Sequence, residues 1–129
     1  TPALCVPVCI PYFRQLLPGG WDAMRQHNRE LVLKGRDLLC RALGTSPAAP
    51  DECIGSMATV ALSDGDAPVP IDTVHGQHPL QVQLWERFKI GVPIVAWPQS
   101  PKRWVRLSAQ LYNSMKDFEK LADALKTLL

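Results

Sequence analysis

The segment "SMKDFEKLADALKTLL", residues 114–129, constrains the fold of this chain more than any other stretch. Its apolar side chains recur every three or four residues, which is the spacing of one face of an α-helix. Ser114 and Asp117 have the spacing of a capping box, with aspartate in place of the usual glutamate, and predict where the helix begins. A stripe this continuous has to pack on another layer of structure. The stripe comprises Phe118, Leu121, Ala122, Leu125, Leu128 and Leu129.

Earlier segments also have helical patterns. Proline is tolerated in a first helical turn but breaks a helix interior, and the "PGG" at residues 18–20 is a strong stop signal. Asp22 suits the first turn of a second helix, and Gly44 suits its C-terminal cap. The expected helices run from near Pro7 or Pro11 to Leu17, over residues 21–43, and from Pro79 to a stop at Gly91.

Short apolar runs between the helices are expected to be strands. The last two runs are joined by the turn residues "PQSPK", and a link this short predicts an antiparallel hairpin. The expected strands are residues 57–62, 92–97 and 103–108. Strands interleaved with about four helices predict an α+β fold, in which helices cover one face of a small, mainly antiparallel sheet. A length of 129 residues suits one domain, residues 1–129.

The charge balance points to no charged partner. Lysine and arginine number 14 and aspartate and glutamate 12, which leaves a net charge of +2. Neither nucleic acid nor a membrane is therefore an expected partner. The longest apolar runs are interrupted well short of the roughly 20 residues of a membrane-spanning helix, and nothing at the start has the form of a secretory leader. We expect a soluble protein.

The cysteines indicate a reducing, cytoplasmic setting. Cys5, Cys9, Cys40 and Cys53 form no CxxC pair and are too sparse for the disulfide framework of a small secreted domain. Cys5 and Cys9 have the spacing of neighbouring helical turns, so a redox pair is one interpretation. The favoured interpretation is that the thiols are buried and inert, and that they pack as small apolar groups.

His75 and His78, in "HGQHP", invite a metal site, with Cys53 as a further ligand. A zinc site needs three or four ligands converging from rigid elements, whereas these histidines share a loop without a nearby carboxylate. We expect them to be solvated or to contact another domain, and we assign no metal ligand. The chain also lacks GxSxG, HExxH, Walker and GxGxxG motifs, so no catalytic residue is assigned. The tryptophans expected in the core or at an interface are Trp85, Trp97 and Trp104.

Arg106 stands within a segment that has the pattern of a buried strand. Alternate residues of a strand share a face, so Val105 and Leu107 point one way. The opposite face carries Trp104, Arg106 and Ser108. Arg106 then either pairs with a surface carboxylate, or lies at a sheet edge, or presents its planar fork to a ligand carboxylate or phosphate. The pattern alone leaves these alternatives open.

The second half of the chain resembles a known family. "GSMATVAL", "LWERFKIGVPIVAWP" and "VRLSAQLYNSMKDFEKLADAL" are similar, in order and spacing, to the C-terminal region of class V aminotransferase-fold enzymes. This is the pyridoxal-phosphate family that includes cysteine desulfurases, and "VPIVAWP" and "RLSAQLYN" most resemble isopenicillin N epimerase and its relatives. "VPVCIPYFRQL" and "GGWDAMRQHNRELV" are similar to the helices that lead into this region. The most specific piece is R-x-S-x-x-x-Y-N, residues 106–113.

The resemblance implies a role for Arg106. In this family the arginine of that motif binds the α-carboxylate of the substrate, and a bidentate carboxylate, or an anion or water, would satisfy a buried guanidinium. Tyr112 and Asn113 match the motif as well, but closing the turn into the last helix explains them equally, so they are not assigned as ligands. The implied activity is that of an enzyme acting on amino acids with pyridoxal phosphate as electron sink. Epimerisation, transamination and elimination all remain open.

The resemblance also implies a missing part. Enzymes of this family hold the cofactor in an N-terminal large domain, through a Schiff-base lysine and an aspartate facing the pyridine nitrogen. Neither motif is found here, so the expected identity is the C-terminal small domain of a longer enzyme. Its expected partners are the large domain, an amino-acid substrate and a second full-length copy, and the fragment alone is expected to be inactive and not to bind pyridoxal phosphate. The alternative is a free-standing, non-catalytic interaction or ligand-binding module with the same fold.

Overall fold

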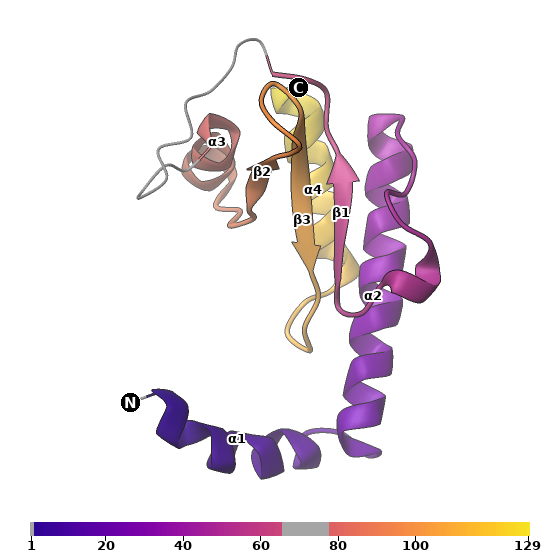
Figure 1. Cartoon of the computed structure of the whole chain (residues 1–129), viewed down its shortest axis with the longest axis vertical. Coiled ribbons are helices and arrows are strands. Elements are labelled where there is room, and N and C mark those ends of the chain that lie inside the picture. Colours follow the sequence, from indigo (N-terminus) through magenta and orange to yellow (C-terminus); the bar gives the residue numbers. More distant parts are fainter. Residues whose placement is uncertain (1, 66–77) are drawn as a thin grey trace.

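A computed structural model describes residues 2–65 and 78–129 of the chain (Figure 1). Four α-helices and a three-stranded antiparallel sheet form the predicted α+β fold. The elements are α1 (Pro2–Gln15), α2 (Gly20–Leu43), the short 3-10 helix η1 (Asp51–Cys53), β1 (Met57–Ala61), α3 (Pro79–Phe88), β2 (Ile94–Ala96), β3 (Arg103–Ser108) and α4 (Met115–Leu128).

The strand order is β1-β3-β2, so β3 lies in the centre of the sheet. Both of its neighbours run antiparallel to it, which confirms the predicted hairpin of β2 and β3. Helices lie behind the sheet in the view of Figure 1, and the strand side chains that face them are buried. Val60, Val105 and Leu107 are the most deeply buried of these. The other face of the sheet carries the exposed residues of the alternating strand pattern.

Helix α4 confirms the C-terminal prediction. The Ser114 backbone N–H donates to Oδ2 of Asp117 across 2.8 Å, and both halves of the capping box are formed. Phe118, Leu121 and Leu125 are buried, whereas Leu129 at the end of the stripe is exposed. The helix therefore lies on the core through most of its predicted stripe.

Helices α2 and α4 approach each other closely at Gly35. A Cβ atom placed on Gly35 would lie 2.7 Å from Cγ of the Phe118 ring, and Phe118 itself is buried. Only a residue without a side chain fits there unless the ring moves. Val32 and Leu39, one turn to either side of Gly35, are fully buried and continue the α2 face of the core.

Helix α1 begins earlier than predicted. It starts at Pro2, and Pro7 and Pro11 lie inside it rather than in its first turn. Pro2 occupies the first helical position, where a missing N–H costs nothing, and this is the start signal that the prediction overlooked. No residue of α1 is buried, and the helix extends away from the other elements in Figure 1. Its link to α2 includes a hydrogen bond from the Trp21 Nε1–H to the Ile10 carbonyl oxygen, 3.2 Å long.

Two further boundaries differ from the prediction. Helix α3 ends at Phe88, before Gly91, because Lys89 takes the left-handed capping position with φ 57°. Strand β2 pairs only over Ile94–Ala96, since Pro93 before it has no N–H to donate. Helix α2 and strands β1 and β3 match their predicted ranges to within one residue.

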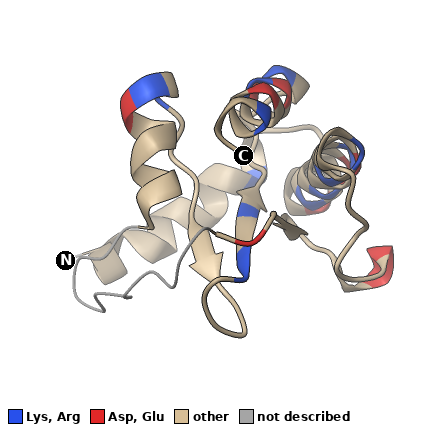
Figure 2. Cartoon of the chain, turned by 90° about the horizontal axis from the view of Figure 1, so that it is seen from above, with Lys and Arg blue, Asp and Glu red and all other residues tan. Residues whose placement is uncertain are grey.

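The described part of the chain has no helix that is both long and apolar enough to cross a membrane. Figure 2 shows basic and acidic bands close together on the helices, as the near balance of charge suggests. Helix α1 is the exception, with Arg14 as its charged residue.

Candidate functional site

Arg106 occupies the middle of the sheet. It lies opposite Thr59 in the register of β1 and β3, and its backbone N–H donates to the Pro93 carbonyl oxygen across 3.0 Å on the other side. Its neighbours Val105 and Leu107 are buried under the helices, so the strand alternation turns the Arg106 side chain to the opposite face, as predicted. Backbone pairing on both sides therefore fixes where the side chain leaves the sheet.

The Arg106 side chain is exposed, and the expectation of a buried guanidinium was wrong. Helices cover only one face of this sheet, and Arg106 is on the open face. Within residues 2–65 and 78–129 its guanidinium has no hydrogen bond and no ion pair. Arg106 is therefore not at a sheet edge, which removes one of the three interpretations of the sequence, and it is not paired with a carboxylate of the described residues. Its five N–H donors are available to an anion.

A groove of about 350 Å³ lies beside Arg106 on the open face. Trp97 is 66% exposed and Val95 is 45% exposed, so two large apolar side chains border it in solvent. The Trp104 Nε1–H donates to the Trp97 carbonyl oxygen across 2.9 Å and fixes the half-buried Trp104 ring. Trp97 and Trp104, which were expected in the core or at an interface, thus line this groove, and neither ring is fully buried. The groove is lined by Ala48, Thr59, Val95, Trp97, Trp104 and Arg106.

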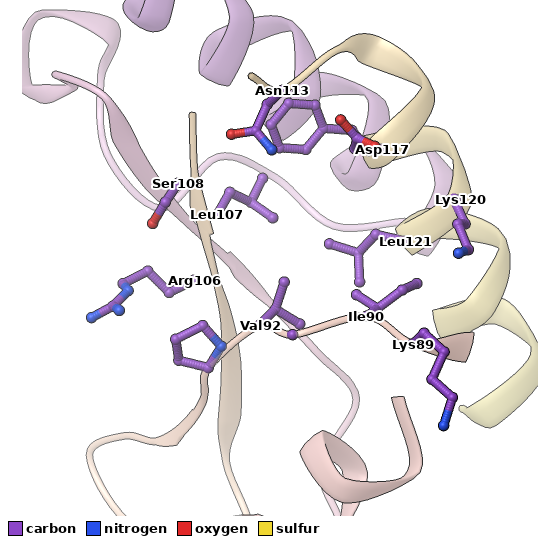
Figure 3. A pocket seen from close by; sticks show the side chains of 13 residues that line it. Lys89, Ile90, Val92, Arg106, Leu107, Ser108, Asn113, Asp117, Lys120 and Leu121 are labelled. Carbon is purple, nitrogen blue, oxygen red and sulfur yellow. The ribbon is translucent and has the colours of Figure 1, made fainter. Parts of the chain in front are cut away.

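A second hollow, of about 300 Å³, lies between β3 and α4 (Figure 3). Leu107, Ile90 and Leu121 form its apolar floor, and the Arg106 guanidinium points away from them. Asp117 at its rim is held in the capping box of α4, and the Lys89 ammonium lies 5.9 Å from the Trp85 ring centroid, whereas Arg106, Ser108 and Lys120 also line this hollow. Arg106 therefore borders both hollows, and in the groove on the open face it lies beside the exposed apolar side chains of Trp97 and Val95.

The residues that line the groove on the open face do not form a cofactor site. Pyridoxal phosphate needs a lysine amine for its aldehyde and a carboxylate opposite its ring nitrogen. The polar side chains lining the groove are Thr59 and Arg106, which supply neither group. The residues lining this groove thus fit a ligand carboxylate and do not fit the cofactor.

The end of the R-x-S-x-x-x-Y-N motif has a structural role. Oδ1 of Asn113 accepts from the Gln110 N–H across 3.0 Å, and the Asn113 N–H donates back to the Gln110 carbonyl oxygen across 2.8 Å. Asn113 thereby closes the turn between β3 and α4, which is the interpretation that needs no ligand. Tyr112 is 85% exposed at the same turn.

His78 caps helix α3. Its Nδ1 accepts from the Leu80 backbone N–H across 3.1 Å, which requires an unprotonated nitrogen. Burial, followed by the nearby Arg103 guanidinium, lowers the pKa of His78 below its ordinary value. His75 lies outside the described residues, so the predicted pair is not tested. In the described ranges no three metal-ligating side chains gather.

All four cysteines are free thiols. Cys40 is buried, as expected, and its burial raises the pKa of the thiol. Cys5, Cys9 and Cys53 are exposed, so the expectation of burial was wrong for them. Cys5 and Cys9 lie on α1, which covers no core, and Cys53 ends the surface helix η1.

The buried arginine of this domain is Arg36, which the sequence analysis did not single out. Its side chain is 4% exposed and forms ion pairs with Asp51 at 2.7 Å and Asp37 at 2.8 Å. A signal was present, because Arg36 lies four residues after Val32 and three before Leu39 on the apolar stripe of α2. Arg36 ties the middle of α2 to η1 through its ion pair with Asp51.

The fold and the groove define a small α+β domain, and on its open sheet face Arg106 has no ion pair with another described residue. Comparison with known proteins gives relatives for this domain. The chain is 33% identical over 129 residues to isopenicillin N epimerase of Amycolatopsis lactamdurans, and 33% identical to that of Streptomyces clavuligerus. It is 29% identical over 134 residues to a probable L-cysteine desulfhydrase, chloroplastic, of Arabidopsis thaliana. A search of protein-family models gives no match.

These matches cover 98% of the chain but only 27 to 29% of the relatives. The chain is a distant homologue, over nearly its whole length, of pyridoxal-phosphate enzymes of the class V aminotransferase family. This confirms the resemblance stated from the sequence.

Proposed function

We propose that this chain is the C-terminal small domain of a longer pyridoxal-phosphate enzyme that acts on amino acids, and that Arg106 binds the α-carboxylate of the substrate. The observation that carries the proposal is the free guanidinium of Arg106, fixed in the central strand and without an ion pair among the described residues. The relatives support it, since the chain matches a part of each that amounts to less than a third of its length.

In this proposal Arg106 holds and orients the substrate. Two parallel N–H donors of the guanidinium bind both carboxylate oxygens, which fixes the direction in which the α-carbon is presented. Orientation of this kind increases the reaction rate because the entropy cost of bringing the reacting atoms together is met on binding. The cofactor is held by the large domain of the complete enzyme. Whether the product is an epimer, a keto acid or an elimination product depends on proton-handling groups in that domain.

We further propose that the complete enzyme is a homodimer in the cytoplasm. The free state of all four cysteines supports a reducing compartment. The unburied, apolar α1 helix supports a contact with another part of the assembly.

The test is the steady-state kinetics of Arg106→Lys in the complete enzyme. Lysine keeps the charge but loses the two-pronged geometry, so we expect kcat/KM for the amino-acid substrate to fall about 100-fold, equivalent to about 3 kcal/mol. The cofactor absorbance and the melting temperature should be retained, because Arg106 is exposed and has no ion pair to lose among residues 2–65 and 78–129.

Arg41→Lys is the matched control, since Arg41 is an exposed arginine on α2. Its kinetics should equal those of the unchanged enzyme. Near-normal kinetics in both Arg106→Lys and Arg106→Ala would contradict the carboxylate role. A collapsed melting temperature would instead assign Arg106 to holding the sheet together.

A further inference from the structure

The groove beside Arg106 combines apolar walls with one charge. Trp97 and Val95 line the groove together with Arg106, and their side chains are 66% and 45% exposed. Exposing them costs hydrophobic free energy that an occupant of the groove would recover. Trp104 is held in place by its 2.9 Å hydrogen bond to the Trp97 carbonyl, so one wall exists before any ligand arrives.

Charge complementarity narrows the choice of occupant. Arg106 is the one charged residue among the described residues that line the groove, and its guanidinium has no ion pair there. A purely apolar molecule would leave the N–H donors of Arg106 without a partner, and a small anion would leave the tryptophan side chains exposed to water. A molecule that carries both a carboxylate and a bulky apolar group satisfies both sides at once. A volume of about 350 Å³ suits a molecule of this size.

We propose that this groove is a subsite for the apolar side chain of a carboxylate ligand whose carboxylate is bound by Arg106. The inference rests on the proposed function and names its substrate class, which is amino acids with a bulky aliphatic or aromatic side chain. Trp97 and Val95 contact the side chain, and Trp104 forms the fixed wall between them and Arg106. The occupant is thus a small organic acid rather than a protein segment.

The test is ligand titration followed by NMR of the tryptophan indole N–H groups in the 129-residue chain. The chain has four tryptophans, so each one reports separately. With 3-phenylpropionate as the probe, the signals of Trp97 and Trp104 should shift in a saturable way. The signals of Trp21 and Trp85, which lie outside the groove, should stay in place.

Two comparison probes separate the parts of the ligand. Propionate keeps the carboxylate without the ring, and 3-phenylpropan-1-ol keeps the ring without the charge. Each should bind about tenfold more weakly than 3-phenylpropionate, because each forfeits one of the two interactions.

Matched variants separate the parts of the groove. Arg106→Gln should weaken 3-phenylpropionate about tenfold and leave 3-phenylpropan-1-ol unchanged, whereas Trp97→Ala should weaken both ring-bearing probes. Arg41→Gln removes an exposed arginine elsewhere and should change neither.

Equal affinity for propionate and 3-phenylpropionate would refute the apolar subsite and leave the carboxylate role of Arg106 intact. If Arg106→Gln bound 3-phenylpropionate as tightly as the unchanged chain, the pairing of the carboxylate with the guanidinium would be refuted. The absence of saturable shifts at about 10 mM probe, or shifts confined to Trp21 and Trp85, would overturn the proposal altogether. The proposed function is tested separately, by the kinetics of the complete enzyme, so the two can fail independently.

Discussion

Replacing Gly35 with alanine tests the packing that positions the sheet. Alanine in a helix interior is normally better than glycine by about 0.5–1 kcal/mol, so helix propensity alone predicts that the variant is more stable. The structure predicts the reverse. The new methyl group would lie 2.7, 2.8 and 2.9 Å from three atoms of the Phe118 ring, closer than carbon atoms can approach. Overpacking of this kind costs about 1–3 kcal/mol, so we expect a net loss of about 0.5–2 kcal/mol in the free energy of unfolding.

The assay is urea unfolding of the chain followed by circular dichroism. Gly55→Ala is the matched control, because nothing lies within 4 Å of its added methyl group, and its stability should change by less than about 0.5 kcal/mol. The double variant Gly35→Ala/Phe118→Leu should recover part of the loss, since leucine lacks the ring that the methyl group meets. A Gly35→Ala variant more stable than the parent chain would refute the close approach of α2 and α4.

Two further predictions concern residues outside the groove. The pKa of His78 is lowered on folding, so the unfolded chain binds the proton of this histidine more readily than the folded chain does. The contribution of His78 to the free energy of unfolding is therefore complete above about pH 6.5 and is lost as the pH falls through the lowered pKa of the folded chain. His78→Asn keeps a side chain that can cap the helix but does not titrate. The urea midpoint should therefore fall less in this variant than in the parent chain when the pH is lowered from about 7.5 to about 5, roughly the range in which histidine titrates. An equal fall in both proteins would refute the role of His78 in the pH dependence. At Arg36, Asp51→Ala should cost about 2–3 kcal/mol because it leaves a buried guanidinium short of a partner, whereas Arg36→Met should cost less since the carboxylates are partly exposed. Equal unfolding free energies for Asp51→Ala and Arg36→Met would refute the claim that leaving the buried guanidinium without a partner is the costlier change.

The parts of the fold that were predictable are set by local chemistry. The capping box of Ser114 and Asp117 joins residues three apart, so the start of α4 could be read directly. The alternation in β3 likewise depends only on the strand period, and it placed Val105 and Arg106 on opposite faces.

The parts that were not predictable depend on which surfaces other elements cover. The strand pattern gives two faces, but it does not say that helices cover only the one with Val105, and so Arg106 was expected to be buried. The same limit applies to Trp97, whose apolar ring suggested the core or an interface, since the sequence does not say which of the two surfaces it joins. Arg36 was missed for the opposite reason: a charged residue on an apolar helical stripe was not considered as a buried one.

The most direct test of the central claim is the location of the cofactor lysine in the protein encoded by the complete reading frame. Pyridoxal phosphate can be fixed to its lysine by borohydride reduction, and the modified peptide can then be mapped by mass spectrometry. We predict one modified lysine per chain, in a domain that precedes residues 1–129, and no stoichiometric modification of the 129-residue chain alone. A modified lysine within residues 1–129, or a complete reading frame without a cofactor-binding domain, would contradict the account, and the latter would favour a free-standing ligand-binding module.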